Sequence, residues 1–321
     1  MNILVTGGAG YIGGTVAATL LARGHSVTVY DNLCHATRAM VPAGAQFIQG
    51  DVADRPKLES LLGSGFDGVL HFAALIEAGE SMAKPEVYFR NNSAATLSLL
   101  EAMLVTGVRR FVFSSTAAVY GEPESTPIRE DAPLRPTNAY GESKLIVEKM
   151  LDWMYRVHGF PYASLRYFNV AGAAAGRGES HEPESHLIPL VLDVALGRRQ
   201  QIRIYGNDYP TLDGTCVRDY IHIEDLAEAH LLALAVLQGG GQRIYNLGNG
   251  SGFTVLQVIE SARRVTGHPI PVEVVERRPG DPAVLIASAA KIERDLGWIP
   301  RHTDLDAIIA SAWEWQKKRY T

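Results

Sequence analysis

The chain has 321 residues, of which 46% are hydrophobic and 20% charged, and its formal net charge is -5. These values are typical of a soluble globular protein with one large domain, or a large domain and a smaller partner. The negative charge argues against a nucleic-acid binder, which needs a cationic face. With only Cys34 and Cys216, and no long apolar segment before the first strand, we expect neither a disulfide framework nor a signal peptide or membrane helix. A cytoplasmic location is therefore expected.

The first half of the chain alternates short β-branched segments with amphipathic ones. The predicted strands are residues 3–6, 26–31, 45–51, 68–74, 109–116 and 162–170. The predicted helices are residues 12–23, a long segment around 85–107, and one that begins near residue 138. Strands that alternate with helices, and that are apolar throughout, indicate a parallel sheet covered on both faces. The predicted fold is α/β, with a Rossmann-type doubly wound parallel sheet.

The pattern changes after Ala171, where a polar, glycine-bearing loop at 176–185 is followed by irregularly mixed helices and strands. We therefore expect residues 1–171 to form a dinucleotide-binding domain. Residues 172–321 are expected to form mainly a smaller α/β substrate-binding cap, with some segments returning to the large domain.

A glycine-rich turn joins the first strand to the first helix. Gly8, Gly10 and Gly13 have GxGxxG spacing, and Gly7, Gly10 and Gly13 have GxxGxxG spacing. Without side chains, backbone amides and the positive end of a helix can approach a pyrophosphate. Because an acidic residue, Asp31, ends the next strand, the context favours a dinucleotide site over a merely tight turn.

Asp31 is expected to accept hydrogen bonds from the adenosine ribose, and its carboxylate would repel a 2′-phosphate. The expected cofactor is therefore NAD and not NADP, although Arg38 is close enough in sequence to mask that charge. Asp51 either meets the adenine edge or is simply a polar strand end.

Tyr140 and Lys144 are four residues apart, which places them on one face of a helix. A tyrosine with an ordinary pKa of about 10 is a poor base, but a nearby lysine and a cationic nicotinamide favour its phenolate. Ser114, Ser115 and Thr116 end the fifth predicted strand, at the sheet edge where such folds bind ligands. A hydroxyl, a tyrosine and a lysine beside a dinucleotide indicate a hydride-transfer site.

Several longer motifs resemble the extended short-chain dehydrogenase/reductase family. They are GGAGYIG (7–13), FSSTAAVYG (113–121), YGESK (140–144) and RYFNVAGA (166–173). Two more, YGNDYPTLDGTCVRDYIHIEDLAEAH (205–230) and RRPGDPA (277–283), resemble the UDP-glucose 4-epimerase branch in particular. The resemblance runs from the first strand to the last helix.

The resemblance implies redox-neutral inversion at C4 of a UDP-sugar, through a transient 4-keto sugar, with NAD retained as a resident cofactor. Tyr140 would exchange the proton of the sugar O4, Lys144 would tune the tyrosine and hold the nicotinamide ribose, and Thr116 would hydrogen-bond O4. The resemblance also implies a homodimer formed by the helices near residues 85–107 and 138–158.

Further contacts are implied residue by residue. The cofactor-binding set, besides Tyr140 and Lys144, is Gly7, Gly10, Tyr11, Ile12, Gly13, Asp31, Asn32, Asp51, Val52, Phe72, Ala73, Ala74, Asn91, Ser114 and Tyr167. The substrate-binding set, besides Thr116, is Asn169, His186, Leu187, Tyr205, Arg218, Arg278, Asp281 and Leu285, with the two arginines at the diphosphate. Two positions depart from common family patterns: Ile76 stands where some members have lysine, and His186 where many have asparagine.

Alternatives remain at the level of the reaction. Family dehydratases carry an acid–base Asp-Glu pair after the threonine, whereas Ala117 and Ala118 follow Thr116 here and cannot move protons. A non-catalytic NAD-sensing regulator would not need Tyr140 and Lys144. Other substrates, such as UDP-N-acetylglucosamine or UDP-pentoses, remain open. The segment HEPESH (181–186) suggests no complete metal-ligand set, and we expect a solvated loop and no metal.

Overall fold

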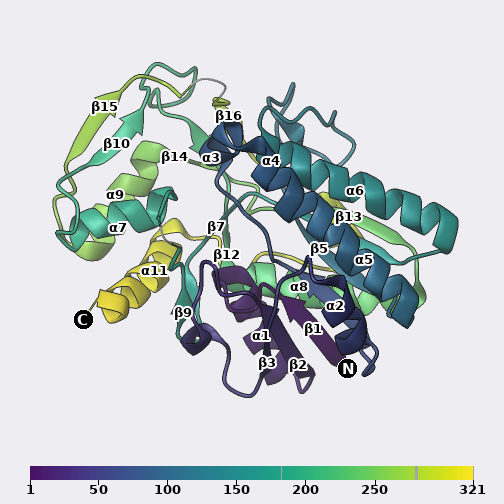
Figure 1. The fold of residues 1–321 in the computed structure, drawn as a ribbon. Helices are drawn as coiled ribbons and strands as arrows, with labels where there is room; N and C mark the ends of the chain where they lie inside the picture. The colour runs from purple at the N-terminus through teal and green to yellow at the C-terminus, as the bar shows by residue number, and fades with distance from the viewer. Residues whose placement is uncertain (182, 279–280, 321) are drawn as a thin grey trace.

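The computed structural model describes residues 1–181, 183–278 and 281–320. Its centre is a seven-stranded parallel sheet with the order β13-β6-β5-β4-β1-β2-β3 (Figure 1). The order reverses between β1 and β4, and such switch points are where these sheets bind ligands. The predicted doubly wound α/β fold is confirmed. The strands are β1 (Asn2–Thr6), β2 (Ser26–Asp31), β3 (Gln46–Gln49), β4 (Gly68–His71), β5 (Phe111–Thr116), β6 (Tyr162–Tyr167) and β13 (Gln242–Leu247).

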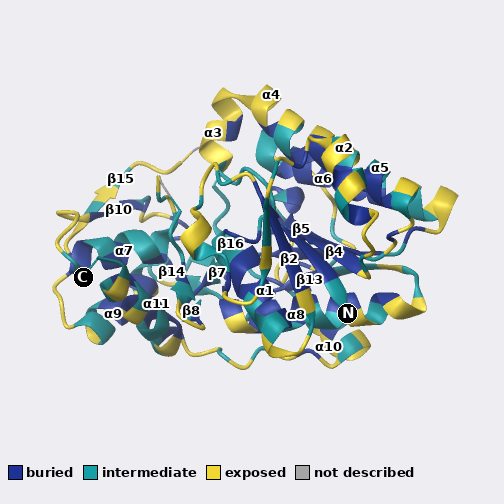
Figure 2. Ribbon diagram, turned by 60° about the horizontal axis from the view of Figure 1, so that its bottom comes forward, coloured by how far each residue is buried: buried dark blue, intermediate teal, exposed yellow. Residues whose placement is uncertain are grey.

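Helices cover both faces of this sheet because alternate strand residues point to opposite sides. On one face, Ile3 and Val5 pack with α1 (Tyr11–Ala22), α8 (Ile223–Val236) and α10 (Ala290–Leu296). On the other, Leu4 packs with α2 (Arg55–Leu62), α5 (Ala95–Thr106) and α6 (Ala139–His158). The inner strands β1, β4, β5 and β6 are therefore buried between two helical layers (Figure 2), which explains their continuous apolar pattern, whereas the edge strand β3 is partly exposed.

The segment predicted as one long helix near 85–107 is interrupted. It comprises α4 (Pro85–Tyr88), a π-helical turn (Phe89–Ala94) and α5, which ends at Gly107 in the left-handed conformation. In that turn the Asn92 side chain bonds both the amide and the carbonyl of Leu75, each at 2.9 Å. The short α3 (Ala78–Ala83) precedes α4. A π-helical turn adds a residue to the helix and often marks a functional region.

Three predicted strands end earlier than expected. β3 stops at Gln49 and β4 at His71, because the chain then turns across the sheet edge towards β1 and β2. The segment predicted at 162–170 breaks after Tyr167. Its remainder forms β7 (Asn169–Ala171), which pairs with β12 (Tyr220–His222) outside the main sheet.

The rest of the chain builds a second core around α7 (Leu187–Ala195), α9 (Val255–Thr266) and α11 (Leu305–Tyr320). Small sheets border it; they are formed by β8 (Ala173–Ala174) with β9 (Arg177–Gly178), β10 (Ile202–Tyr205) with β15 (Val272–Val275), and β14 (Phe253–Thr254) with β11 (Val217–Arg218) and β16 (Val284–Leu285). Although they lie beyond residue 171, β13 and α8 belong to the large sheet and its covering layer. We keep the division at residue 171, with these returning segments, as a proposal. None of the described helices combines the length and apolarity needed to span a bilayer.

Candidate active site

The glycine-rich turn is shaped so that side chains cannot be accommodated at two of its positions. Gly7 has φ +73°, and a Cβ there would lie 2.5 Å from the amide nitrogen of Ala73. A Cβ on Gly13 would lie 2.3 Å from the Gly7 carbonyl oxygen. The helix α1 follows with Gly10 as its N-cap, and no side chain caps it. Its first amides are therefore left for an anionic ligand.

A cavity of about 340 Å³ opens at this turn. Every residue of the predicted cofactor-binding set lines it, and so do Thr116, Ile76, Asn169 and His186. The uncapped helix end and the acidic residue at the end of β2 fit a dinucleotide chemically. The individual contacts remain predictions.

At the adenosine end, the Asp31 carboxylate accepts hydrogen bonds from the amides of Ala9 at 3.1 Å and Leu33 at 2.8 Å. The Arg38 guanidinium lies over the Phe47 ring, 5.4 Å from its centroid. That stacking directs Arg38 to β3, which leaves the Asp31 charge in place to disfavour a 2′-phosphate. The Asn32 side chain donates to Asp51 at 2.9 Å, which joins the ends of β2 and β3.

The predicted catalytic residues meet where β5 ends against the start of α6. Asn138 caps α6 by accepting from the Gly141 amide at 2.8 Å. The buried Lys144 donates from Nζ to the Ser114 carbonyl at 2.9 Å, and burial lowers its pKa to about 7. Burial raises the pKa of Tyr140 to about 12; a hydrogen bond with Thr116 opposes the rise and the charge of Glu77 adds to it. The protein without ligands therefore keeps the phenol protonated, and an added positive charge is needed to make it a base.

A second cavity, of about 650 Å³, adjoins the first. Asn169, Val170 and His186 line both cavities, so a molecule in one can reach a molecule in the other. The predicted substrate residues that line the second cavity are Asn169, His186, Leu187, Tyr205, Arg218, Arg278 and Asp281.

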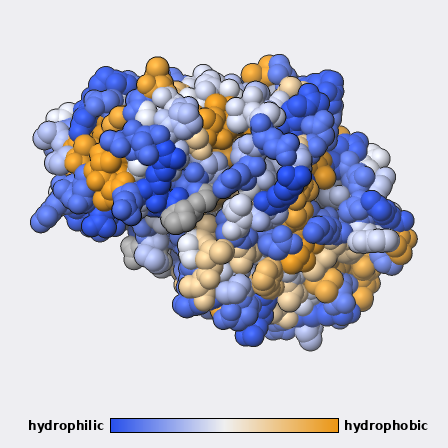
Figure 3. Space-filling model, turned by 90° about the horizontal axis from the view of Figure 1, so that it is seen from above, coloured by the Kyte–Doolittle hydropathy of each residue, from blue (hydrophilic) through white to orange (hydrophobic). Residues whose placement is uncertain are grey.

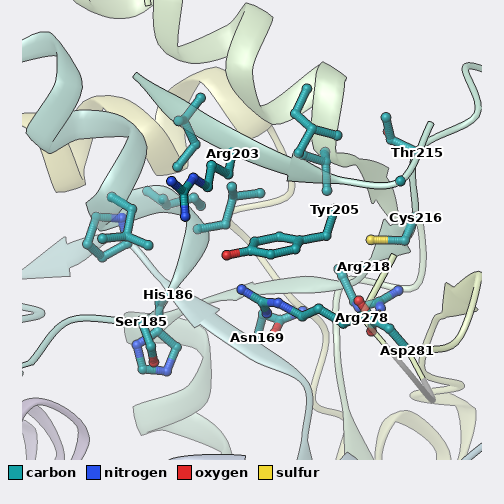
Figure 4. A pocket seen from close by; sticks show the side chains of 18 of the residues that line it. Asn169, Ser185, His186, Arg203, Tyr205, Thr215, Cys216, Arg218, Arg278 and Asp281 are labelled. Carbon is teal, nitrogen blue, oxygen red and sulfur yellow. Dashed lines mark hydrogen bonds and ion pairs between the residues drawn. The ribbon is translucent and has the colours of Figure 1, made fainter. Parts of the chain in front are cut away.

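Two arginines stand on one side of this second cavity. Figure 4 shows Arg218, Arg278 and Asp281 grouped there, with Tyr205 above them. Arg218 forms an ion pair with Asp281, and the Arg278 guanidinium lies 3.9 Å from the centroid of the Tyr205 ring. Arg218 does not pair with its neighbour Asp219, because the buried Asp219 carboxylate accepts from the backbone amides of Asn249, Gly250 and Ala287.

His186 is the N-cap residue of α7, and its Nδ1 lies 2.7 Å from Oε1 of Glu184. Burial lowers the pKa of this imidazole, but the bond to Glu184 and the charge of Glu179 outweigh burial and raise it to about 9. His186 lines both cavities, and its raised pKa favours the cationic form there, whereas an asparagine would be neutral.

Leu285 lines neither cavity within the described part of the chain. It is in register with Arg218 across β11 and β16, and it packs against a cluster that includes Val119, Tyr120 and Leu145. It therefore lies on the strand next to Arg218 but outside the cavity that Arg218 lines. That Leu285 limits the size of the sugar remains a prediction.

Sequence reasoning missed the part that His181 and His186 play. The segment 181–186 was expected to be a solvated loop, but these two residues line the first cavity, as do Glu179 and Ser180 just before them. His181 pairs with Glu77 at 3.3 Å and stacks on His35, with ring centroids 5.3 Å apart. The sequence pattern of this segment does not predict these contacts. The only indication of a functional role was the concentration of His and Glu residues.

The family can be identified from this fold and site. Residues 3–248 match the model of the NAD dependent epimerase/dehydratase family, and the chain belongs to it. The chain is 57% identical over 314 residues to UDP-glucose 4-epimerase of Streptomyces lividans. The aligned region covers 97% of this chain and 95% of the relative.

Two solved structures are also similar. One is UDP-glucose-4-epimerase from Stenotrophomonas maltophila with bound NAD and formylated UDP-arabinopyranose: its TM-score is 0.96 at 41% identity, covering 99% of this chain and 98% of that one. The other is UDP-glucose 4-epimerase from Bifidobacterium longum in complex with NAD+ and UDP: its TM-score is 0.94 at 40% identity, with the same coverage.

Proposed function

We propose that the protein is a UDP-glucose 4-epimerase, which interconverts UDP-glucose and UDP-galactose with NAD as a retained cofactor. The observation that carries the proposal is the position of Thr116, Tyr140 and Lys144. They line a cavity whose residues fit a dinucleotide chemically, next to a second cavity whose lining includes Arg218 and Arg278. The names of the relatives agree with this assignment.

The chemistry that NAD supplies when bound is reversible hydride transfer at the sugar C4. Gly7, Gly10 and Gly13 would leave space and free backbone amides for its pyrophosphate. Asp31 would accept hydrogen bonds from its adenosine ribose. Tyr140 takes the proton of the O4 hydroxyl and returns it to O4 after the 4-keto sugar has turned over. Thr116 orients O4 between the two proton transfers.

The same residues must hold the substrate without fixing the sugar in one orientation. Arg218 and Arg278 suit the diphosphate, because a guanidinium offers charged donors in fixed directions. Holding UDP at the diphosphate leaves the hexose free to present either face of C4. Lys144, anchored on Ser114, holds its amino group on the face of α6 that carries Tyr140.

Elimination chemistry is disfavoured by the residues after Thr116. Ala117 and Ala118 form the 3₁₀ turn that Thr116 caps by accepting from the Ala118 amide at 3.1 Å. Neither side chain can transfer a proton to C6, as a 4,6-dehydratase requires. The assignment is therefore to epimerisation.

We also propose that the protein is a homodimer in the cytoplasm. Leu97 and Val105 on α5, and Trp153 and Val157 on α6, are large apolar residues that are exposed on these two helices, which lie side by side (Figure 1). Figure 3 shows separate groups of hydrophobic atoms on the surface, some of them on the side of these helices. Large apolar residues exposed on neighbouring helices suit a permanent contact with a second copy. The free Cys34 and Cys216 suit a reducing compartment.

The direct test is conversion of UDP-galactose to UDP-glucose by the purified protein with no added reductant. Net turnover without consumption of NAD or NADH would support epimerisation. A stoichiometric need for an oxidant or reductant, or release of a dehydrated sugar, would refute it.

A further inference from the structure

A buried polar network lies beneath the catalytic residues and has no role in the chemistry described above. Tyr140, Lys144 and Glu148 are spaced four residues apart on α6, so they share one face of the helix. Glu148 is 5% exposed, and its partner Arg166 on β6 is 2% exposed. A charged pair at this depth requires an explanation, because apolar residues of similar size are often equally stable there.

Every contact of Glu148 joins α6 to the sheet. Its Oε1 accepts from Ser115 Oγ at 2.6 Å, from Ser164 Oγ at 2.8 Å and from Arg166 Nε at 3.0 Å. Its Oε2 accepts from Arg166 Nη2 at 2.5 Å. Arg166 also donates to the Tyr120 hydroxyl at 2.9 Å. A fully satisfied network of charge-assisted bonds holds its members rigidly.

Three consecutive residues of β5, Ser114 to Thr116, lie opposite the three residues on this face of α6. The Ser114 carbonyl accepts from Lys144, and Ser115 donates to Glu148. Thr116 and Tyr140, the third pair in this series, line the same cavity. The apolar contacts of α6 are not directional, so they permit the helix to slide along the sheet. Directional hydrogen bonds fix the position of the helix along its own axis.

We propose that Glu148 is a positioning residue for the epimerase reaction: through Ser115 it fixes the end of β5 against α6, so that the hydroxyls of Thr116 and Tyr140 meet. Arg166 holds the Glu148 carboxylate in place from β6. The inference rests on the proposed function only in taking Tyr140 as the base.

Replacing Glu148 itself would leave Arg166 buried and unpaired, which is strongly destabilising. The test therefore uses Ser115→Ala, with Ser164→Ala as its matched control. Both serines are fully buried and donate to the same oxygen of Glu148, but only Ser115 adjoins Thr116.

We expect the two variants to lose similar amounts of stability on denaturant unfolding. The kcat of Ser115→Ala should fall about three- to tenfold with KM little changed, because positioning acts on the chemical step. Ser164→Ala should keep the parent kcat. Equal kcat values for the two variants would overturn the proposal.

A second readout needs no substrate. The hydrogen bond from Thr116 lowers the pKa of Tyr140, so a displaced Thr116 should let the tyrosine ionise at higher pH. Ultraviolet pH titration of each protein, minus that of the same protein carrying Tyr140→Phe, isolates this ionisation. It should move upward in Ser115→Ala and stay in place in Ser164→Ala, and no difference between them would refute the role of Glu148. If the parent protein proved to lack epimerase activity, the proposed function would fail while this titration still decided the positioning role.

Discussion

The Lys144 ammonium and the Ser114 carbonyl are joined by a 2.9 Å hydrogen bond that ties the helix carrying Tyr140 to the strand carrying Thr116. The bond keeps a lysine inside the protein where only 2% of its surface is exposed. Part of the cost of burial is therefore carried by the folded state, in exchange for an amino group held in a fixed position near the site. This arrangement leads to a prediction that separates stability from activity.

Lys144→Met should abolish most activity and yet raise thermal stability by about 5 °C at neutral pH. Burial lowers the folded-state pKa of Lys144 to about 7 from 10.5. Between these two pH values the unfolded chain binds a proton that the folded chain does not, so the parent gains stability as pH rises through this window. The advantage of the methionine variant should shrink accordingly. Melting curves across this pH range, at matched dinucleotide content, measure it. The exposed Lys149→Met on the same helix gives the baseline, and a pH-independent difference would contradict the prediction.

Tyr140→Phe should fold normally, because only a hydroxyl is lost, and should lower kcat by about a hundred- to ten-thousandfold. Dinucleotide content and melting temperature should stay near the parent values, which distinguishes loss of the base from loss of the site. Steady-state epimerase assays decide the matter. Near-full turnover would show that another group exchanges the O4 proton.

The cofactor should remain with the protein through purification, because a redox-neutral cycle gains nothing by releasing it. Protein denatured directly after purification should release NAD or NADH and little NADP, since Asp31 is expected to face the ribose and Arg38 is stacked on Phe47. Chromatography of the released nucleotides provides the measurement. Asp31→Asn should reduce the preference for NAD over NADP. Recovery of mainly NADP from the parent would contradict the role of Asp31.

Substrate breadth is expected to depend on Leu285. The parent should act well on UDP-galactose and UDP-glucose and weakly on UDP-N-acetylgalactosamine, because leucine is intermediate in size and cannot bond an acetamido group. Leu285→Ser should raise the relative kcat/KM for the acetylated substrate, and Leu285→Tyr should lower it. The structure places Leu285 beside Arg218 but against the cluster of Val119 and Tyr120. An unchanged ratio in both variants would assign it to packing alone.

The proposed homodimer depends on the exposed apolar side of α5 and α6. Trp153→Glu should produce monomers, because Trp153 is 63% exposed and a buried, unpaired carboxylate would oppose association. Sedimentation velocity gives the oligomeric state. Leu212→Glu is the control, since Leu212 is 89% exposed but lies beyond α6 in the second half of the chain. Dimers that survive Trp153→Glu but not Leu212→Glu would place the interface elsewhere.

Much of the cofactor site could be predicted from sequence because it is built from local rules. Gly7 and Gly13 are required by close backbone approaches within and beside one turn. Asp31 is simply the last residue of its strand, and Tyr140 and Lys144 share a helix face because of their spacing. The parallel order of the sheet then brings these residues to one edge, where the predicted cofactor residues line a single cavity.

What only the tertiary structure decided depends on segments that are distant in sequence. Arg218 forms an ion pair with Asp281, 63 positions away, and not with its neighbour Asp219. The Asp219 carboxylate already accepts hydrogen bonds from three backbone amides in the interior. The raised pKa of His186 follows from nearby carboxylates that outweigh burial, and the lowered pKa of Lys144 follows from burial; no periodicity reveals either. Glu148 looks like an ordinary helix residue until β5 and β6 bring Ser115, Ser164 and Arg166 to its carboxylate. Local patterns determine which backbone forms, whereas long-range packing determines which polar groups lose water and which partners they find.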